Sequence, residues 1–177
     1  MARVSRILLV LLVLCSACPR ERDENGTKAS YEAISLDGTT VSLDALRGRV
    51  VLLNVWTLWC PPCRAEMSVL ERLHRDYRPA GLALVGVNID GRMDLPAVRS
   101  FLRQAGLTFD VWLDPDDAVS RRFPTPSLPA TYLIARDGRI VWSRLGVVHP
   151  DDPELGTALR NTLRAEQLAR APGEPSS

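Results

Sequence analysis

A nearly continuous apolar segment, Val50–Trp56, is followed after three residues by the motif Cys60-Pro-Pro-Cys63. This junction constrains the fold more than any other feature. An uninterrupted apolar run is typical of a central strand that is covered on both faces. The residues from Pro61 to Tyr77 have helical spacing, and prolines suit the first turn of a helix, where N–H groups lack intrahelical partners. We therefore predict a buried strand, a short loop and a helix that begins at the cysteine pair.

The rest of the chain alternates between strand-like and helix-like patterns. Strands are expected at Tyr31–Leu36, Thr39–Ser42, Leu82–Ile89, Phe109–Leu113, Ala130–Ile134 and Arg139–Arg144, and helices at Leu95–Ala105, Ala118–Phe123 and Pro153–Arg170. Asp37-Gly38 and Asp137-Gly138 each separate two strands and favour hairpins. The order predicts an α/β fold: a central mixed sheet flanked by helices, with an N-terminal β-hairpin.

Length and charge limit the domain organisation and the partners. The chain has 177 residues and a formal net charge of +1, which fits one compact domain and makes nucleic acid an unlikely partner. We expect that domain over residues 31–170. Residues 19–30 are polar without periodicity and predict a flexible tether, and residues 171–177 predict a disordered tail.

The N-terminus has the layout of an export signal. Basic residues precede the apolar run Ile7–Leu14, and the small residues of Cys15-Ser-Ala-Cys18 follow it. The run is too short to cross a bilayer, which takes about 20 apolar residues. The end of the signal resembles the lipobox of bacterial lipoproteins, although Cys15 stands where Leu is usual. We expect lipidation of Cys18 and a domain tethered at a membrane outside the cytoplasm. An ordinary signal cut after Ala17, or a retained anchor, stays open.

The predicted helix places the two cysteines differently and so predicts different roles for them. Cys63 shares a helical face with Met67, Leu70, Leu73 and Tyr77, so it should point inward. Cys60 should lie at the exposed tip, where free N–H groups and the helix dipole stabilise a thiolate. We expect Cys60 to attack a substrate disulfide and Cys63 to resolve the mixed disulfide, with Trp59 beside the attacking sulfur and with Pro61 and Pro62 shaping the turn.

The same residues allow three other interpretations of the cysteine motif. A structural disulfide is possible in an exported protein, but a ring this small adds little loop-closure entropy. A zinc site needs four ligands, and the second pair, Cys15 and Cys18, lies in the signal. Thr57-x-x-Cys60 imitates peroxidase spacing, but Leu53 stands where such sites have Pro. Redox exchange without a metal or cofactor is favoured.

The motif Trp-Cys60-Pro-Pro-Cys63-Arg-Ala-Glu, with Leu128-Pro129 before an apolar strand, resembles thioredoxin-like proteins of the bacterial envelope, the TlpA, ResA and CcmG group. The resemblance implies a thioredoxin-like fold and a reductase of envelope disulfides such as those of apocytochrome c. It also implies a membrane electron donor of the CcdA or DsbD type. Pro129 matches the family's cis-proline, which would keep metals off the thiols, and the Leu128 backbone would pair with substrate. A simple loop proline is the alternative.

Two carboxylates are candidates for supporting roles. Thioredoxin buries an Asp where this chain has Asn54, so another acid is needed. Asp90 follows the predicted strand Leu82–Ile89, whose carboxyl end should lie near the active site; a solvated turn is the alternative. Glu66, three residues after Cys63, is the second candidate, and a solvent-facing charge is the simpler interpretation.

The functional alternatives are an oxidase or isomerase of the same fold and a Cu(I)-carrying metallochaperone. Copper carriers place three residues between their cysteines and use a later His. The two-residue spacing of Cys60 and Cys63 and the presence of Pro129 argue against copper. We expect a monomer that acts on protein disulfides.

Overall fold

The computed structural model describes residues 28–170, with side chains to Arg164. The predicted signal, Cys18, most of the tether and the tail at 171–177 lie outside the described residues. Among those described, no helix has the length and apolar content to cross a membrane.

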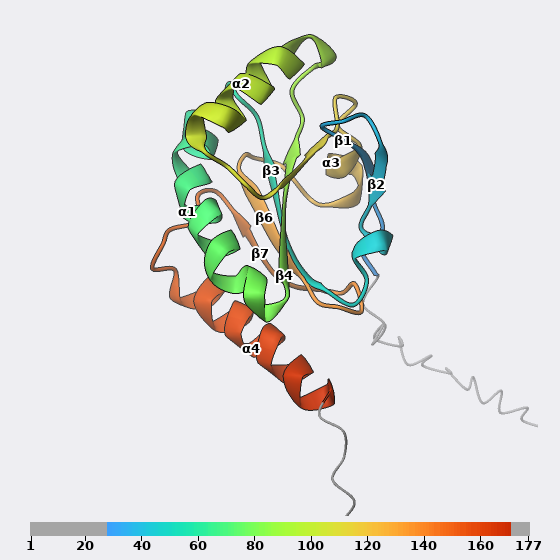
Figure 1. Ribbon diagram of the computed structural model, residues 1–177, viewed down its shortest axis with the longest axis vertical. Coiled ribbons are helices and arrows are strands. Elements are labelled where there is room, and N and C mark those ends of the chain that lie inside the picture. The colour runs from blue at the N-terminus through green and yellow to red at the C-terminus, as the bar shows by residue number, and fades with distance from the viewer. Residues whose placement is uncertain (1–27, 171–177) are drawn as a thin grey trace, which may run out of the picture.

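A seven-stranded mixed sheet forms the centre of the domain, in the order β2-β1-β5-β4-β3-β6-β7 (Figure 1). The strands are β1 (Glu32–Ser35), β2 (Thr40–Ser42), β3 (Val50–Trp56), β4 (Leu82–Asn88), β5 (Asp110–Leu113), β6 (Ala130–Ile134) and β7 (Ile140–Leu145). The neighbours β3, β4 and β5 run parallel, and the remaining pairs are antiparallel. Every residue of β3 and β4 is buried, as expected of strands covered on both faces.

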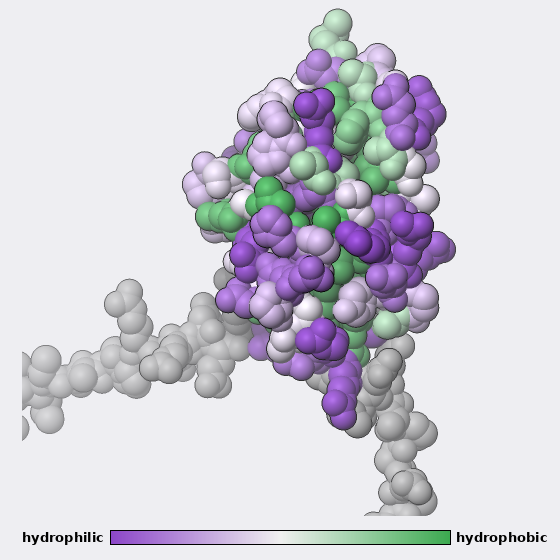
Figure 2. Space-filling view, turned by 90° about the vertical axis from the view of Figure 1, so that its left-hand side faces the viewer, coloured by the Kyte–Doolittle hydropathy of each residue, from purple (hydrophilic) through white to green (hydrophobic). Residues whose placement is uncertain are grey.

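Helices cover both faces of the sheet. The α-helices are α1 (Pro61–Tyr77), α2 (Leu95–Ala105), α3 (Ala118–Arg122) and α4 (Pro153–Arg170), and 3₁₀ turns lie at Asp44–Leu46, Arg78–Ala80 and Arg92–Asp94. Helices α1, α2 and α4 contribute to one apolar core, and α3 contributes to a second core on the other face. The outer surface on the side of Figure 1 where α1 lies is mainly polar, with small apolar areas between the polar side chains (Figure 2). These helices are therefore amphipathic, as the periodicity predicts.

The α/β fold and most predicted elements are confirmed. The bounds of β3, α1, α2, β6 and α4 agree with the sequence prediction, and the other predicted elements differ from it by one residue at one or both ends. The predicted inward face of α1 is also confirmed. Cys63, Met67 and Leu70 are buried, and Leu73 and Tyr77 pack against the same core.

The predicted boundary between tether and domain is wrong by a few residues. Ala29 is buried, and its N–H donates to the Gly138 carbonyl at 2.8 Å. The Ser30 hydroxyl donates to Asp44, and Arg122 donates to the Ser30 carbonyl. Polar composition alone predicts a tether there, but tertiary contacts hold residues 28–30 against the domain.

Candidate active site

The cysteine pair lies where β3 passes into α1. Cys60 is the N-cap of α1, and it forms a disulfide with Cys63, with 5.3 Å between the two Cα atoms. The Cys63 N–H donates to the Cys60 sulfur at 3.2 Å. Pro61 and Pro62 occupy the first two helical positions, so neither can supply such a bond. The helix start therefore offers Cys60 a donor, as predicted.

The prediction that Cys60 lies at an exposed tip is wrong. Cys60 is only 5% exposed and belongs to the same apolar core cluster as fully buried Cys63. The exposed residues around it are Trp59, at 71%, and the two prolines. The tertiary packing of the turn after β3 covers the sulfur, and helical periodicity says nothing about that turn. A substrate therefore reaches Cys60 through a groove that this residue lines.

That groove has a volume of about 520 Å³ and brings together segments far apart in the chain. Trp59–Pro62 and residues 125–128 both line it. The peptide bond between Leu128 and Pro129 is cis, as predicted. Leu128 lines the groove with Cys60, whereas Pro129 is buried beneath.

Glu66 is not a solvent-facing charge, so the simpler interpretation of the sequence is wrong. It is 1% exposed and lies one turn beyond Cys63 on α1. The Asn54 side-chain amide and the Val148 N–H each donate to its carboxylate at 2.8 Å. Burial raises the pKa of Glu66 to about 7, and the two hydrogen bonds oppose that rise. A carboxyl group in this state can hold or release a proton near neutral pH.

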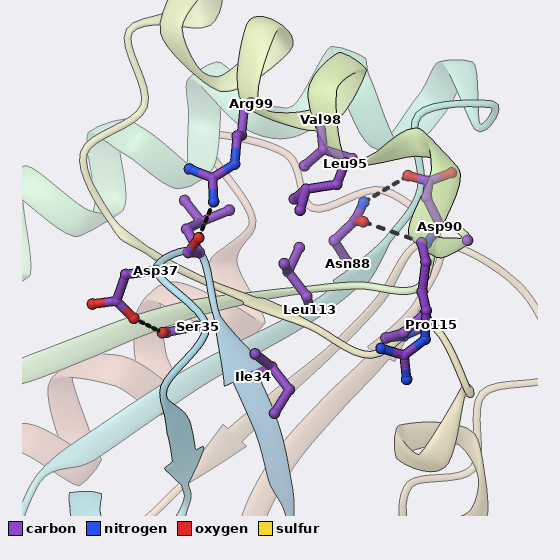
Figure 3. A pocket seen from close by; sticks show the side chains of 14 residues that line it. Ile34, Ser35, Asp37, Asn88, Asp90, Leu95, Val98, Arg99, Leu113 and Pro115 are labelled. Carbon is purple, nitrogen blue, oxygen red and sulfur yellow. Dashed lines mark hydrogen bonds between the residues drawn. The ribbon is translucent and has the colours of Figure 1, made fainter.

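Asp90 is likewise buried, so the interpretation as a solvated turn is wrong. Its carboxylate accepts the Leu58 N–H at 2.8 Å. It also accepts the Asn88 side-chain amide at 2.7 Å (Figure 3). Leu58 belongs to the loop that leads to Cys60, and Asn88 ends β4. Asp90 therefore ties the loop before the cysteine pair to the end of the neighbouring strand.

A second cavity, of about 290 Å³, lies on the other side of Asp90. Apolar side chains of β1, α2 and β5 line it, including Ile34, Val98 and Leu113, and the Arg99 guanidinium donates to the Leu36 carbonyl at its rim (Figure 3). Of the sequence-predicted site residues, Asp90 lines this cavity, whereas Trp59, Cys60, Pro61, Pro62 and Leu128 line the first groove.

Several residues of the site have no signal in the sequence. Ile89, Asp117, Ser120 and Thr125 line the groove because β4, α3 and the segment before β6 converge there. Val148 reaches Glu66 from the loop between β7 and α4. Only the tertiary structure brings these residues to the cysteine pair. Within residues 28–170, no group of three or more His, Cys, Asp or Glu side chains could hold a metal ion.

The geometry is that of a thioredoxin-like dithiol–disulfide enzyme: a disulfide-forming pair at a helix start beside a cis-proline. Comparison with known proteins agrees, since residues 26–143 match the AhpC/TSA family. A "Thiol-disulfide oxidoreductase ResA" of Bacillus cereus is 29% identical over 150 residues, covering 78% of this chain and 86% of the relative. The ResA of Geobacillus kaustophilus is 32% identical over 128 residues, with 72% of each chain covered.

A crystal structure from Chlorobium tepidum, provisionally described as the thiol:disulfide interchange protein DsbE, superposes with a TM-score of 0.71 at 28% identity. The match covers 78% of this chain and 96% of that one. The chain belongs to the AhpC/TSA family and is a thiol–disulfide oxidoreductase of the TlpA, ResA and CcmG type.

Proposed function

We propose that this enzyme reduces protein disulfides outside the cytoplasm, with Cys60 as the nucleophile and Cys63 as the resolving thiol. The Cys60 thiolate attacks one sulfur of the substrate disulfide, and the second substrate sulfur leaves and takes up a proton. Cys63 then loses its proton and attacks Cys60, which releases the first substrate sulfur as a thiol. The products are a substrate dithiol and the Cys60–Cys63 disulfide.

The groove supports this assignment because it gives a polypeptide access to Cys60. Residues 125–128 precede β6 and line the same groove as Cys60 and exposed Trp59. We assign substrate pairing to the Leu128 backbone and substrate contact to Trp59, with Pro129 fixing the turn of the chain. Pro61 and Pro62 line the groove beside Cys60.

Glu66 is the proposed acceptor of the Cys63 proton. Residues three apart on a helix are neighbours, and Cys63 and Glu66 are both almost fully buried. Bulk water is therefore a poor acceptor there, whereas a carboxyl group with a pKa of about 7 can take the proton. Asp90 has a different proposed role, which is to position the loop before Cys60 through Leu58.

Asn54 is suited to serve Glu66 in both protonation states. Its Nδ2 donates to Glu66 at 2.8 Å and to the Thr131 hydroxyl at 3.0 Å, which suits a charged Glu66. Rotation of the amide by half a turn would let its oxygen accept from both groups when Glu66 is protonated. An Asp at this position would add a second negative charge beside Glu66.

The hydrogen-bond donors near the Cys60 sulfur support the proposal that the protein reduces its substrates. The Cys63 N–H reaches the sulfur, while the Arg64 N–H donates to the Cys60 carbonyl and the Arg64 side chain is exposed. A strongly oxidising disulfide needs a thiolate with more stabilisation than one uncharged donor supplies. We therefore propose a reducing pair, with a reduction potential nearer thioredoxin, about −270 mV, than DsbA, about −120 mV.

Equilibration of the purified domain against glutathione tests the direction. We expect a potential well below about −180 mV, the value for protein disulfide isomerase. A potential above it would make the protein an oxidase or isomerase. Metal analysis of the reduced protein gives a separate test, because stoichiometric Cu(I) would favour the metallochaperone alternative.

We further propose that Cys18 carries a lipid that anchors the protein as a monomer at the membrane, where a CcdA- or DsbD-type donor re-reduces it. The apolar run Ile7–Leu14 before Cys15-Ser-Ala-Cys18 supports an export signal. Apocytochrome c is the proposed substrate class, based on the family resemblance. Mass spectrometry of the membrane fraction should find acylated Cys18 at the N-terminus; an unmodified N-terminus at or after Cys18 would indicate plain secretion.

A further inference from the structure

We propose that the groove at Cys60 selects polypeptide disulfides flanked by Lys or Arg, through the carboxylate of Asp117. This inference rests on the proposed function, since it concerns which substrates that groove binds. The cysteine pair alone does not select substrates by the charge of the residues beside their disulfide.

Asp117 is the charged residue among those that line the groove in the described structure. The others are apolar, proline or hydroxyl side chains: Trp59, Cys60, Pro61, Pro62, Ile89, Ser120, Thr125, Pro126, Ser127 and Leu128. A single charge on a largely uncharged wall discriminates between substrate side chains, because nothing else in the groove offsets it. The sign of this charge favours a cation.

The position of the Asp117 carboxylate is well defined. Asp117 lies directly before α3 in the left-handed backbone region, at φ 48°, and it is half-buried. The Ser120 hydroxyl, which also lines the groove, donates to its carboxylate at 2.6 Å. An anion that is held in place and partly shielded from water loses less to screening than a mobile surface carboxylate.

Three arginines near Asp117 have other partners. Arg92 pairs with Asp116 at 3.3 Å, the Arg121 guanidinium donates to the Asp116 carbonyl, and Arg122 donates to the Lys28 and Ser30 carbonyls. The group that holds Asp117 is a neutral hydroxyl. Asp114, a second carboxylate just before this loop, is buried and accepts the Val119 N–H. None of these arginines lines the groove, so among the described residues Asp117 supplies the one charge that a substrate side chain meets there.

Asp116 supplies a matched control. It has the same charge and lies next to Asp117, but it is exposed, pairs with Arg92 and does not line the groove. Asp117→Asn removes the groove charge with little change in shape, and Asn tolerates the left-handed backbone region as Asp does. Asp116→Asn removes an equal charge one residue away.

The test uses the reduced full domain and three synthetic peptides, each closed by one disulfide. They differ only in the residue next to the attacked cysteine, which is Lys, Gln or Glu. Each rate is divided by the rate with dithiothreitol, which corrects for the intrinsic reactivity of the peptide. We expect the wild type to prefer the Lys peptide to the Glu peptide by about tenfold, as one partly shielded charge allows.

For each variant, the Lys and Glu rates are divided by that variant's own Gln peptide rate. On this scale Asp117→Asn should lower the preference to about threefold or less, whereas Asp116→Asn should keep it. High salt should reduce the wild-type preference. Equal preferences in the wild type and Asp117→Asn, or an equal loss in Asp116→Asn, would overturn the proposal. Failure of the wild type to reduce even the Gln peptide would instead count against the proposed function. Matching far-UV circular dichroism and urea midpoints for the wild type and both variants show that the variants are folded.

Discussion

The two ends of α1 each bury a glutamate, and the two residues have different surroundings. Glu66, near the cysteine pair, accepts from the Asn54 amide and the Val148 N–H, and both donors are uncharged. Glu71, at 6% exposure, accepts the Thr108 N–H at 2.8 Å and the Thr108 hydroxyl at 2.7 Å, and Arg75 lies 3.8 Å away. The partners at one end leave a carboxyl group able to take a proton, while those at the other hold the loop before β5.

Burial raises the pKa of Glu66 to about 7, and its two uncharged donors oppose that rise. Under the proposed function Glu66 therefore serves the chemistry, whereas Glu71 holds the loop before β5 through Thr108. If this comparison is right, changes at the first end of α1 alter catalysis, and changes at the second alter stability alone.

The largest effect should come from the cysteines themselves. Cys60→Ser removes the attacking sulfur and should abolish disulfide exchange, measured as the reduction of insulin or a disulfide peptide. Cys63→Ser retains attack but not resolution, so it should accumulate mixed disulfides, visible on non-reducing gels. His74→Gln at the other end of the helix serves as the control and should remain active. Exchange by Cys60→Ser would exclude Cys60 as the nucleophile.

The pH dependence of stability should distinguish the two glutamates next. The pKa of Glu66 is raised from 4.5 to about 7 in the folded protein, so the folded state binds an extra proton between those values. The contribution of Glu66 to stability is therefore fully present below about pH 4.5, falls as pH rises toward 7 and levels off above it. The loss across this window should be about 3 kcal/mol.

Urea unfolding of the oxidised protein at pH 5 and pH 8 measures this effect. Glu66→Gln should remove most of the difference between the two pH values, because the amide does not titrate. Glu71→Gln should be less stable at both, since Gln is a weaker acceptor for Thr108. The same pH slope in the wild type and Glu66→Gln would place the titrating group elsewhere.

Exchange rates should separate the same two variants. Glu66→Gln removes the proposed proton acceptor and should slow resolution by Cys63 at least about tenfold at pH 7. The wild-type rate should rise with pH through about 7 as Glu66 ionises, and the variant should lack that rise. Glu71→Gln should keep the wild-type rate and pH profile. Loss of activity in both variants would show that burial, rather than chemistry, determines the effect.

The smallest effect is expected at Asp90. Asp90→Ala leaves the Leu58 N–H and the Asn88 amide without their acceptor, which should cost about 1–3 kcal/mol of stability. Because Leu58 precedes the cysteine pair, the Cys60 thiolate pKa should also shift, measured by alkylation rate against pH. Ser35→Ala, at the rim of the second cavity, is the control and should leave that pKa unchanged.

Much of the fold could be predicted from the sequence because its signals are local. The apolar run of β3, the prolines at the start of α1 and the Asp-Gly turns act through a few neighbouring residues. Strand β3 and helix α1 have their predicted bounds, and the strands beside the Asp-Gly turns lie within one residue of theirs. The domain boundary predicted at residue 31 is too late, because amino-acid composition does not indicate that tertiary contacts bury Ala29.

The sequence by itself determined the chemistry: a cysteine pair at a helix start, a proline before a buried strand and two acids nearby. Only the tertiary structure decided which groups surround them. It buried Glu66 under Val148 and beside Asn54, tied Asp90 to Leu58, covered Cys60 and placed Asp117 in the groove. The reason is physical: helical and strand periodicity give the face on which a side chain lies, whereas burial and pKa depend on segments that are distant in the chain.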